Sequence, residues 1–114
     1  MAMQPYSPQA PDRTEVERLP GPVVLEFGTN WCGYCSAARP LVERAFAAHP
    51  GVRHIRVEDG PGRVLGRSFR VKLWPTLVFL RDGKEVARVV RPGDPAELVN
   101  AFASIDDPDA AAAT

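Results

Sequence analysis

Residues 23–35 read VVLEFGTNWCGYC, and this stretch decides how the chain folds. Its first five residues are β-branched, apolar or aromatic apart from Glu26, and they follow a Pro-Gly-Pro triplet, which predicts a short buried strand. Cys32 and Cys35 stand three positions apart where the strand pattern ends. From residue 34 to residue 49 apolar side chains recur at helical spacing, so the two cysteines are predicted to open an amphipathic helix.

This position of the cysteines predicts a redox pair. The unpaired amides and the positive dipole end at a helix start stabilise a thiolate, here on Cys32. Because the thiolate is the form that attacks a disulfide, Cys32 is the predicted nucleophile, and Cys35, one turn further in, is predicted to resolve the mixed disulfide. Such a pair carries both electrons itself, so we expect no metal and no organic cofactor.

A zinc site is the alternative use of these cysteines. Cys32, Cys35, His49 and His54 satisfy the spacing rule of a Cys₂His₂ site. A zinc finger, however, needs both histidines on one helix and a hairpin around the cysteines, whereas Pro50-Gly51 separates the histidines and a strand leads into the cysteines. We therefore expect no metal site.

Outward from this stretch, helical and strand patterns alternate along the chain. Strands separated by helices imply parallel pairing with right-handed crossovers, and Asp82-Gly83 predicts a hairpin that adds an antiparallel edge. The expected fold class is α/β, with a central mixed four-stranded sheet flanked by helices on both faces. Helices are predicted over residues 12–19, 34–49, 63–69 and 95–105, and strands over 23–27, 52–57, 76–80 and 85–90.

Length and composition fit one globular domain. The 114 residues are 45% hydrophobic and 25% charged. Residues 1–11 are polar and proline-rich without periodicity, which predicts a disordered tail; residues 12–105 form the predicted domain, and residues 106–114 a second disordered tail.

Net charge and hydropathy argue against several classes of partner. Lys+Arg 14 balances Asp+Glu 14, so the zero net charge gives no electrostatic reason to bind nucleic acid or an acidic membrane surface. The apolar runs are far shorter than the roughly 20 residues that span a bilayer, and the first residues lack the pattern of a secretory leader. We expect a cytoplasmic monomer.

Four features of the sequence belong together: the VVLEF strand before Trp31-Cys32-Gly33-x-Cys35, Pro40 five residues after the second cysteine, Trp74-Pro75-Thr76 opening the third strand, and the Asp82-Gly83 hairpin. Together they resemble the thioredoxin family over about residues 13–105. The resemblance implies a thioredoxin-like fold and a protein-disulfide oxidoreductase active in electron transport and cell redox homeostasis. It also implies protein disulfides as substrates and a separate reductase that regenerates the dithiol.

The resemblance also implies roles for individual side chains. Glu26 matches the buried acid that shuttles protons for the second cysteine; an edge carboxylate that faces water is the other interpretation of this residue. Trp31, Tyr34 and Trp74 would form an apolar rim on which an extended peptide substrate docks, its backbone pairing with the segment before Pro75. Pro75 matches the proline that family members hold in the cis form beside the sulfurs.

Three residues depart from the family pattern. Tyr34 stands where proline is usual, Glu26 replaces aspartate, and His54 takes the place of a lysine that pairs with that acid. We predict that Glu26 and His54 form a coupled pair beneath Cys35, and that Glu26→Gln slows the resolving step while stabilising the fold. The expected activity is that of a reductant; the alternative is a non-catalytic thioredoxin-like adaptor or chaperone-like binding module.

Overall fold

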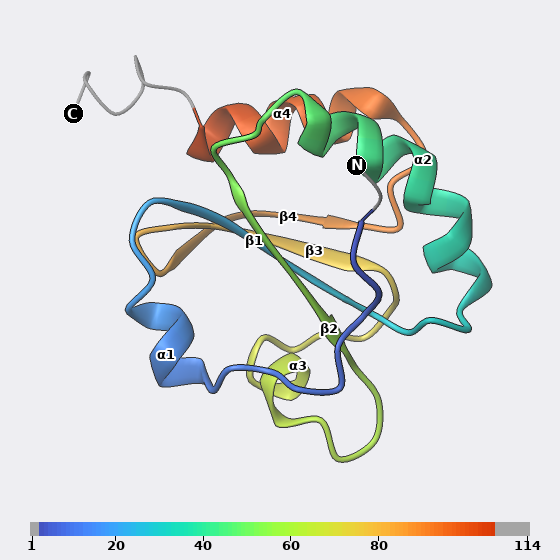
Figure 1. Cartoon of the computed structure of the whole chain (residues 1–114), viewed down its shortest axis with the longest axis vertical. Coiled ribbons are helices and arrows are strands. Elements are labelled where there is room, and N and C mark those ends of the chain that lie inside the picture. The colour runs from blue at the N-terminus through green and yellow to red at the C-terminus, as the bar shows by residue number, and fades with distance from the viewer. Residues whose placement is uncertain (1–2, 107–114) are drawn as a thin grey trace.

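A four-stranded sheet forms the centre of the computed structural model, which describes residues 3–106 (Figure 1). The strand order is β2-β1-β3-β4. The two central strands are almost entirely buried, which explains why their sequences are nearly continuous apolar runs. The strands are β1 (Pro22–Gly28), β2 (Arg53–Glu58), β3 (Thr76–Arg81) and β4 (Lys84–Val90).

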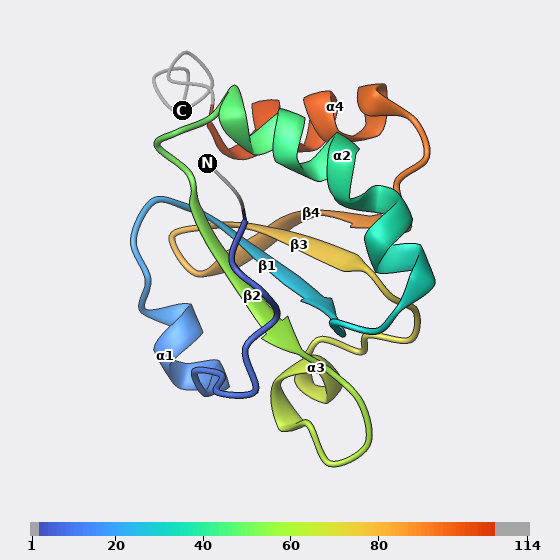
Figure 2. The same cartoon turned by 45° about the vertical axis from the view of Figure 1, so that its right-hand side comes forward.

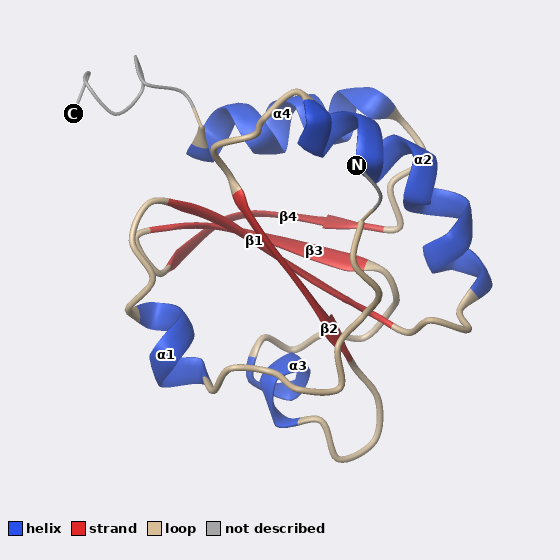
Figure 3. Cartoon of the chain, in the orientation of Figure 1, coloured by secondary structure: helices blue, strands red, loops and turns tan. Residues whose placement is uncertain are grey.

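Helices cover both faces of this sheet (Figures 2 and 3). On one face α2 (Gly33–Ala47) and α4 (Pro95–Ile105) pack on a core that includes Val24 and Phe79. On the other face α1 (Arg13–Glu17) and α3 (Val64–Ser68) cover a second core around Leu25 and Val78. The predicted fold class is confirmed. Within residues 3–106 no helix is long and apolar enough to cross a membrane.

The direction of β3 corrects one expectation. β1 and β2 are parallel, as the intervening helix predicts, but β3 runs antiparallel to β1, with Phe27 opposite Thr76. The connection through the five-residue α3 does not carry the chain back along the length of the sheet. The chain therefore enters β3 at the end of the sheet where β2 finishes, and Trp74-Pro75 comes to lie beside the start of α2.

The first residues form an ordered arm instead of a disordered tail. Residues 3–8, called here the N-terminal arm, run beside the edge strand β2 (Figures 1 and 2). Ser7 pairs with Val57 in a parallel bridge, and Tyr6 is only 3% exposed. The expectation of disorder over residues 1–11 is thus wrong for this segment, because one buried aromatic ring and edge pairing hold it in place. At the other end, Asp106 bonds His49 at 2.7 Å, and the rest of the predicted 106–114 tail lies outside the described residues.

Candidate active site

The two cysteines lie at the start of α2. Cys32 is the N-cap residue of the helix, and its sulfur accepts a hydrogen bond of 3.4 Å from the backbone amide of Cys35. Both residues are free thiols and nearly enclosed, with 7% of Cys32 and 4% of Cys35 exposed. The helical pattern and the strand before it therefore bring the pair together at the end of β1, as their spacing predicts.

The pKa values of the two thiols are shifted in opposite directions. Burial acts against a charged Cys32, but hydrogen bonds from Cys35 and Tyr34 and the charge of Arg91 outweigh it, so the pKa of Cys32 is lowered. Burial raises the pKa of Cys35 to about 11, and the neighbouring Cys32 adds to this effect. At neutral pH one sulfur is therefore disposed to be a thiolate while the other keeps its proton.

Aromatic side chains border the cysteines. Trp31 and Tyr34 are 76% and 59% exposed, and Trp31 meets Trp74 edge to face at a centroid distance of 5.8 Å. The Trp74-Pro75 peptide bond is cis. Arg91 lies with its guanidinium 3.7 Å from the centre of the Tyr34 ring and donates a 2.8 Å hydrogen bond to the Trp74 carbonyl. Arg91 thus connects the first turn of α2 to the loop before β3, a link absent from the sequence predictions.

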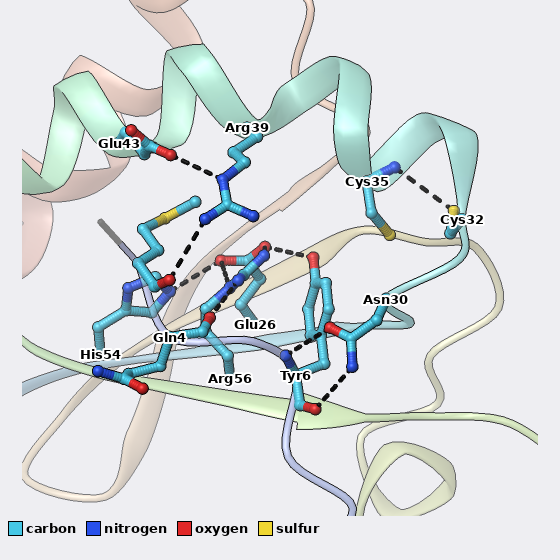
Figure 4. Close-up of polar contacts among 11 residues, drawn as sticks. Gln4, Tyr6, Glu26, Asn30, Cys32, Cys35, Arg39, Glu43, His54 and Arg56 are labelled. Atoms are coloured by element: carbon cyan, nitrogen blue, oxygen red, sulfur yellow. Dashed lines mark hydrogen bonds and ion pairs between the residues drawn. The ribbon is translucent and has the colours of Figure 1, made fainter.

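Glu26 lies beneath the cysteines in the middle of β1 and is only 1% exposed (Figure 4). It is therefore not an edge carboxylate that faces water. The predicted contact with His54 is confirmed, since His54 Nε2 lies 2.8 Å from Glu26 Oε1. Arg56 adds two bonds, from Nε to Oε1 at 3.2 Å and from Nη2 to Oε2 at 3.1 Å, and the Tyr6 hydroxyl donates to Oε2.

These contacts keep the buried carboxylate charged. A carboxylate has about four lone-pair sites, and all four on Glu26 are occupied by donors from three side chains. Burial alone would raise the pKa of Glu26, but the hydrogen bonds from His54 and Arg56 outweigh burial and hold this pKa below its ordinary value. Glu26 is therefore an anion at neutral pH, within a group that we call the Glu26 cluster: Glu26, His54, Arg56 and Tyr6.

Two members of the Glu26 cluster were missed by sequence reasoning. Arg56 had a signal, because period-two spacing puts it on the same face of β2 as His54, and the register places it opposite Glu26. For Tyr6 the sequence offered no signal except that it is an aromatic residue in a polar segment. Its burial depends on the pairing of the N-terminal arm with β2.

The histidines of the zinc alternative have other partners. His49 bonds Asp106 and stacks on Phe102, whereas His54 bonds Glu26 and stacks on Phe46. Among residues 3–106 no group of three or more His, Cys, Asp or Glu side chains could hold a metal ion. The geometry instead assembles a dithiol with one activated sulfur, a protected second sulfur and a charged carboxylate below them.

Comparison with known proteins supports the same chemistry. The thioredoxin family model matches residues 11–104. Thioredoxin Asp f 28 of Aspergillus fumigatus is 33% identical over 85 residues, covering 75% of this chain and 79% of that protein. A Chlamydia pneumoniae thioredoxin is 34% identical over 80 residues, covering 70% and 78%.

A solved structure agrees more closely still. Thioredoxin 2 from Pseudomonas aeruginosa PAO1, in its reduced form, is 62% identical and superposes with a TM-score of 0.80, covering 89% of this chain and 94% of that one. The fold, the paired cysteines at the start of α2 and these similarities lead to one conclusion: the chain belongs to the thioredoxin family and is a thiol–disulfide oxidoreductase.

Proposed function

We propose that this protein works as a reductant of protein disulfides, with Cys32 as the attacking thiol and Cys35 as the resolving thiol. The observation that carries the proposal is the opposite displacement of the two thiol pKa values at one helix start. A lowered pKa makes Cys32 a nucleophile at neutral pH, whereas the protonated Cys35 stays inert until the mixed disulfide has formed.

The reaction then has two steps. In the first, the Cys32 thiolate attacks one sulfur of the client disulfide, and the other client sulfur leaves as a thiolate. In the second, Cys35 loses its proton and attacks Cys32, which releases the second client thiolate and leaves a Cys32–Cys35 disulfide. The client gains two electrons and the protein loses two, so a separate reductase must restore the dithiol.

Glu26 is the proposed base for the second step. It is charged, buried and on the strand beneath Cys35, which is where a proton acceptor for that thiol is needed. His54 bonds the far side of the carboxylate and has 16% of its side chain exposed, so it connects the buried acid with solvent. Arg56 is a positioning residue that keeps the carboxylate ionised.

The aromatic rim is the proposed docking site for the client. Trp31 and Tyr34 present large exposed apolar surfaces next to the cysteines, and exposed aromatic residues are typical of binding surfaces. Trp74 and Pro75 form the opposite border, where an extended client segment would pair with the backbone before β3. Clients of this kind are protein chains with accessible disulfides.

The working compartment follows from the direction of the reaction. A protein that reduces disulfides needs a reducing environment, which favours the cytoplasm. There it would pass electrons from its reductase to clients and so contribute to redox homeostasis. We propose that it acts as a monomer, because one chain carries both thiols and the rim.

The proposed division of roles predicts the behaviour of two serine variants in the reduction of insulin by dithiothreitol. Wild type should accelerate precipitation, and Cys32→Ser should abolish the acceleration because no nucleophile remains. Cys35→Ser, reduced and then freed of dithiothreitol before insulin is added, should accumulate mixed disulfides with insulin, visible by non-reducing electrophoresis, since the resolving thiol is lost. Equal precipitation with wild type and Cys32→Ser would favour a non-catalytic adaptor.

Alkylation across a pH series tests the thiol assignment directly. Iodoacetamide labels thiolates, and mass spectrometry of the peptides distinguishes the two sites. Cys32 should react below the ordinary cysteine pKa of about 8.5, and its reactivity should fall only as the pH drops through its own lowered pKa. Cys35 should become reactive only toward about pH 11. Preferential labelling of Cys35 at pH 7 would contradict the assignment.

Because of the Glu26 cluster, we now expect Glu26→Gln to destabilise the fold, whereas the sequence alone predicted that it would stabilise it. Glu26→Gln would leave Arg56, whose side chain is only 5% exposed, without a counter-charge. We therefore expect the free energy of unfolding at pH 7 to fall by about 3 kcal/mol, measured with urea. In wild type the contribution of Glu26 is present above about pH 4.3, the ordinary glutamate pKa, and is lost as the pH falls through the lower folded value.

A matched control is available on the surface. Glu43→Gln removes one partner of the exposed Arg39–Glu43 pair, at 2.7 Å, and should change stability by about 0.5 kcal/mol or less. Glu26→Gln with Arg56→Met should recover much of the lost stability because no unpaired charge remains. A Glu26→Gln protein as stable as wild type would contradict the charge-pair account.

The direction of electron flow is tested by equilibrating the Cys32–Cys35 pair with glutathione. A reductant should have a reduction potential of about −270 mV, and a strong oxidant one of about −120 mV. We expect the more negative value, because this chain's relatives are thioredoxins. A value near that of the oxidants would overturn the proposed direction while leaving the thiol roles in place.

A further inference from the structure

The Tyr6 hydroxyl lies between the two groups that the resolving step must connect. It donates a hydrogen bond to Glu26 Oε2. On its other side is Cys35: a Cβ atom placed on Gly28 would be 2.7 Å from Cys35 Sγ and 2.8 Å from the Tyr6 hydroxyl. Only glycine at position 28 leaves room for the sulfur and the phenol to converge on this point. Figure 4 shows the hydroxyl between the Glu26 carboxylate and the Cys35 sulfur.

The hydroxyl has the hydrogen-bonding capacity for a relay. A phenol carries one proton and can accept hydrogen bonds at its oxygen. Since the Tyr6 proton is donated to Glu26, the oxygen is left as an acceptor for the thiol proton of Cys35. We propose that Tyr6 is the proton relay of the resolving step, passing the Cys35 proton to Glu26. This inference rests on the proposed function, in which Cys35 resolves the mixed disulfide.

The step balances in protons and electrons. As the Cys35 sulfur forms its bond with Cys32 Sγ, the client sulfur leaves with the electron pair of the broken mixed disulfide. The Cys35 proton moves to the Tyr6 oxygen while the Tyr6 proton moves to Glu26 Oε2. Glu26 then holds the proton on Oε2 and later loses it to solvent, while the departing client thiolate takes a proton from solvent. Because proton transfer accompanies bond formation, Cys35 never becomes a free buried thiolate.

The charge states of Cys35, Tyr6 and Glu26 agree with this sequence of proton transfers. Burial raises the pKa of Cys35 to about 11, so the thiol keeps its proton until a partner takes it. Burial and the charge of Glu26 raise the pKa of Tyr6, so the phenol never holds a lasting negative charge of its own. Glu26 remains an anion because of Arg56 and His54. Tyr6 can therefore pass a proton on but does not rest as a phenolate.

The N-terminal arm fixes the ring in this position. Asn30 accepts a 2.8 Å bond from the Tyr6 amide and donates a 3.1 Å bond to its carbonyl, closing a two-bond clamp. The Arg56 guanidinium lies 3.9 Å from the ring centre, so the residue that pairs with Glu26 also holds the phenol. The backbone bridge of Ser7 with Val57 secures the arm on β2. Such preorganisation is what a relay between fixed groups requires.

A competing proton route exists beside the relay. A small pocket lies against Cys35 and Tyr6, and a water molecule in it could take the thiol proton without the phenol. Its other lining residues are Thr29, Asn30, Ser36, Arg39 and Arg56. The two routes differ in how many protons move together, which a kinetic experiment can separate.

The test compares wild type with Tyr6→Phe, which removes the hydroxyl but keeps the ring that packs against Arg56. Reduced protein is mixed with excess of a cystine-containing peptide, and tryptophan fluorescence follows a single turnover. At low peptide concentration the slope reports attack by Cys32, and at high concentration the limiting rate reports resolution by Cys35. Tyr6→Phe should slow resolution by about 10²-fold, a typical contribution of acid–base catalysis, and leave the attack unchanged.

Proton inventories in mixtures of light and heavy water distinguish a relay from a structural role. Resolution in wild type should give a curved inventory because two protons move together, and Tyr6→Phe a linear one because a single proton passes to water. Ser7→Ala is the matched control, since it keeps the backbone bridge of the arm, and it should behave as wild type does. The relay would be overturned if Tyr6→Phe slowed both steps equally, or if it resolved the mixed disulfide at the wild-type rate.

Failure of the proposed function would look different. Wild type itself would then form no mixed disulfide with the peptide, and Cys35→Ser would trap none. A relay that fails within a correct function would instead leave wild type and Tyr6→Phe equally competent in both steps.

Discussion

A buried negative charge is the constraint on which the rest of this structure depends. Glu26 lies in the centre of the sheet with 1% of its surface exposed, and such a charge is tolerated only when it is paired and fully hydrogen-bonded. Two donors come from β2, His54 and Arg56, and the third is Tyr6 from the N-terminal arm. The register of β1 with β2 and the path of the arm are therefore tied to one carboxylate.

The same constraint separates the chemistry of the two sulfurs. The arm that brings Tyr6 to Glu26 also covers Cys35, so the second thiol is buried and keeps its proton. Cys32, at the helix start, receives hydrogen bonds that favour its thiolate. One helix turn thus holds two cysteines with different reactivities. This difference supports the proposed order, in which Cys32 attacks first and Cys35 resolves second.

The proposed client-facing side joins the first turn of α2 to the loop before β3, and Arg91 connects them. It lies against the Tyr34 ring, bonds the Trp74 carbonyl, and its charge favours the Cys32 thiolate. Tyr34 stands where proline is usual in the family, and its ring offers Arg91 a flat surface to pack on. The departure at position 34 and the arginine at position 91 are therefore parts of one local arrangement.

The sequence by itself determined the local elements and the redox pair. Hydrophobic periodicity, the Asp82-Gly83 turn and the position of Cys32 and Cys35 depend on neighbours within a few residues, so they can be read from the chain. The expected pairing of Glu26 with His54 came from family resemblance, and the contact is present.

Only the tertiary structure decided the direction of β3, the pairing of Arg56 and the ordered arm that buries Tyr6. Tyr6 and Glu26 are 20 positions apart, and Arg56 and Glu26 are 30. Such contacts depend on strand register and on which segment covers an edge. Local patterns do not determine these contacts, although period-two spacing puts Arg56 on the same face of β2 as His54. A buried charge is tolerated only with partners that hydrogen-bond it, and the whole fold brings those partners together.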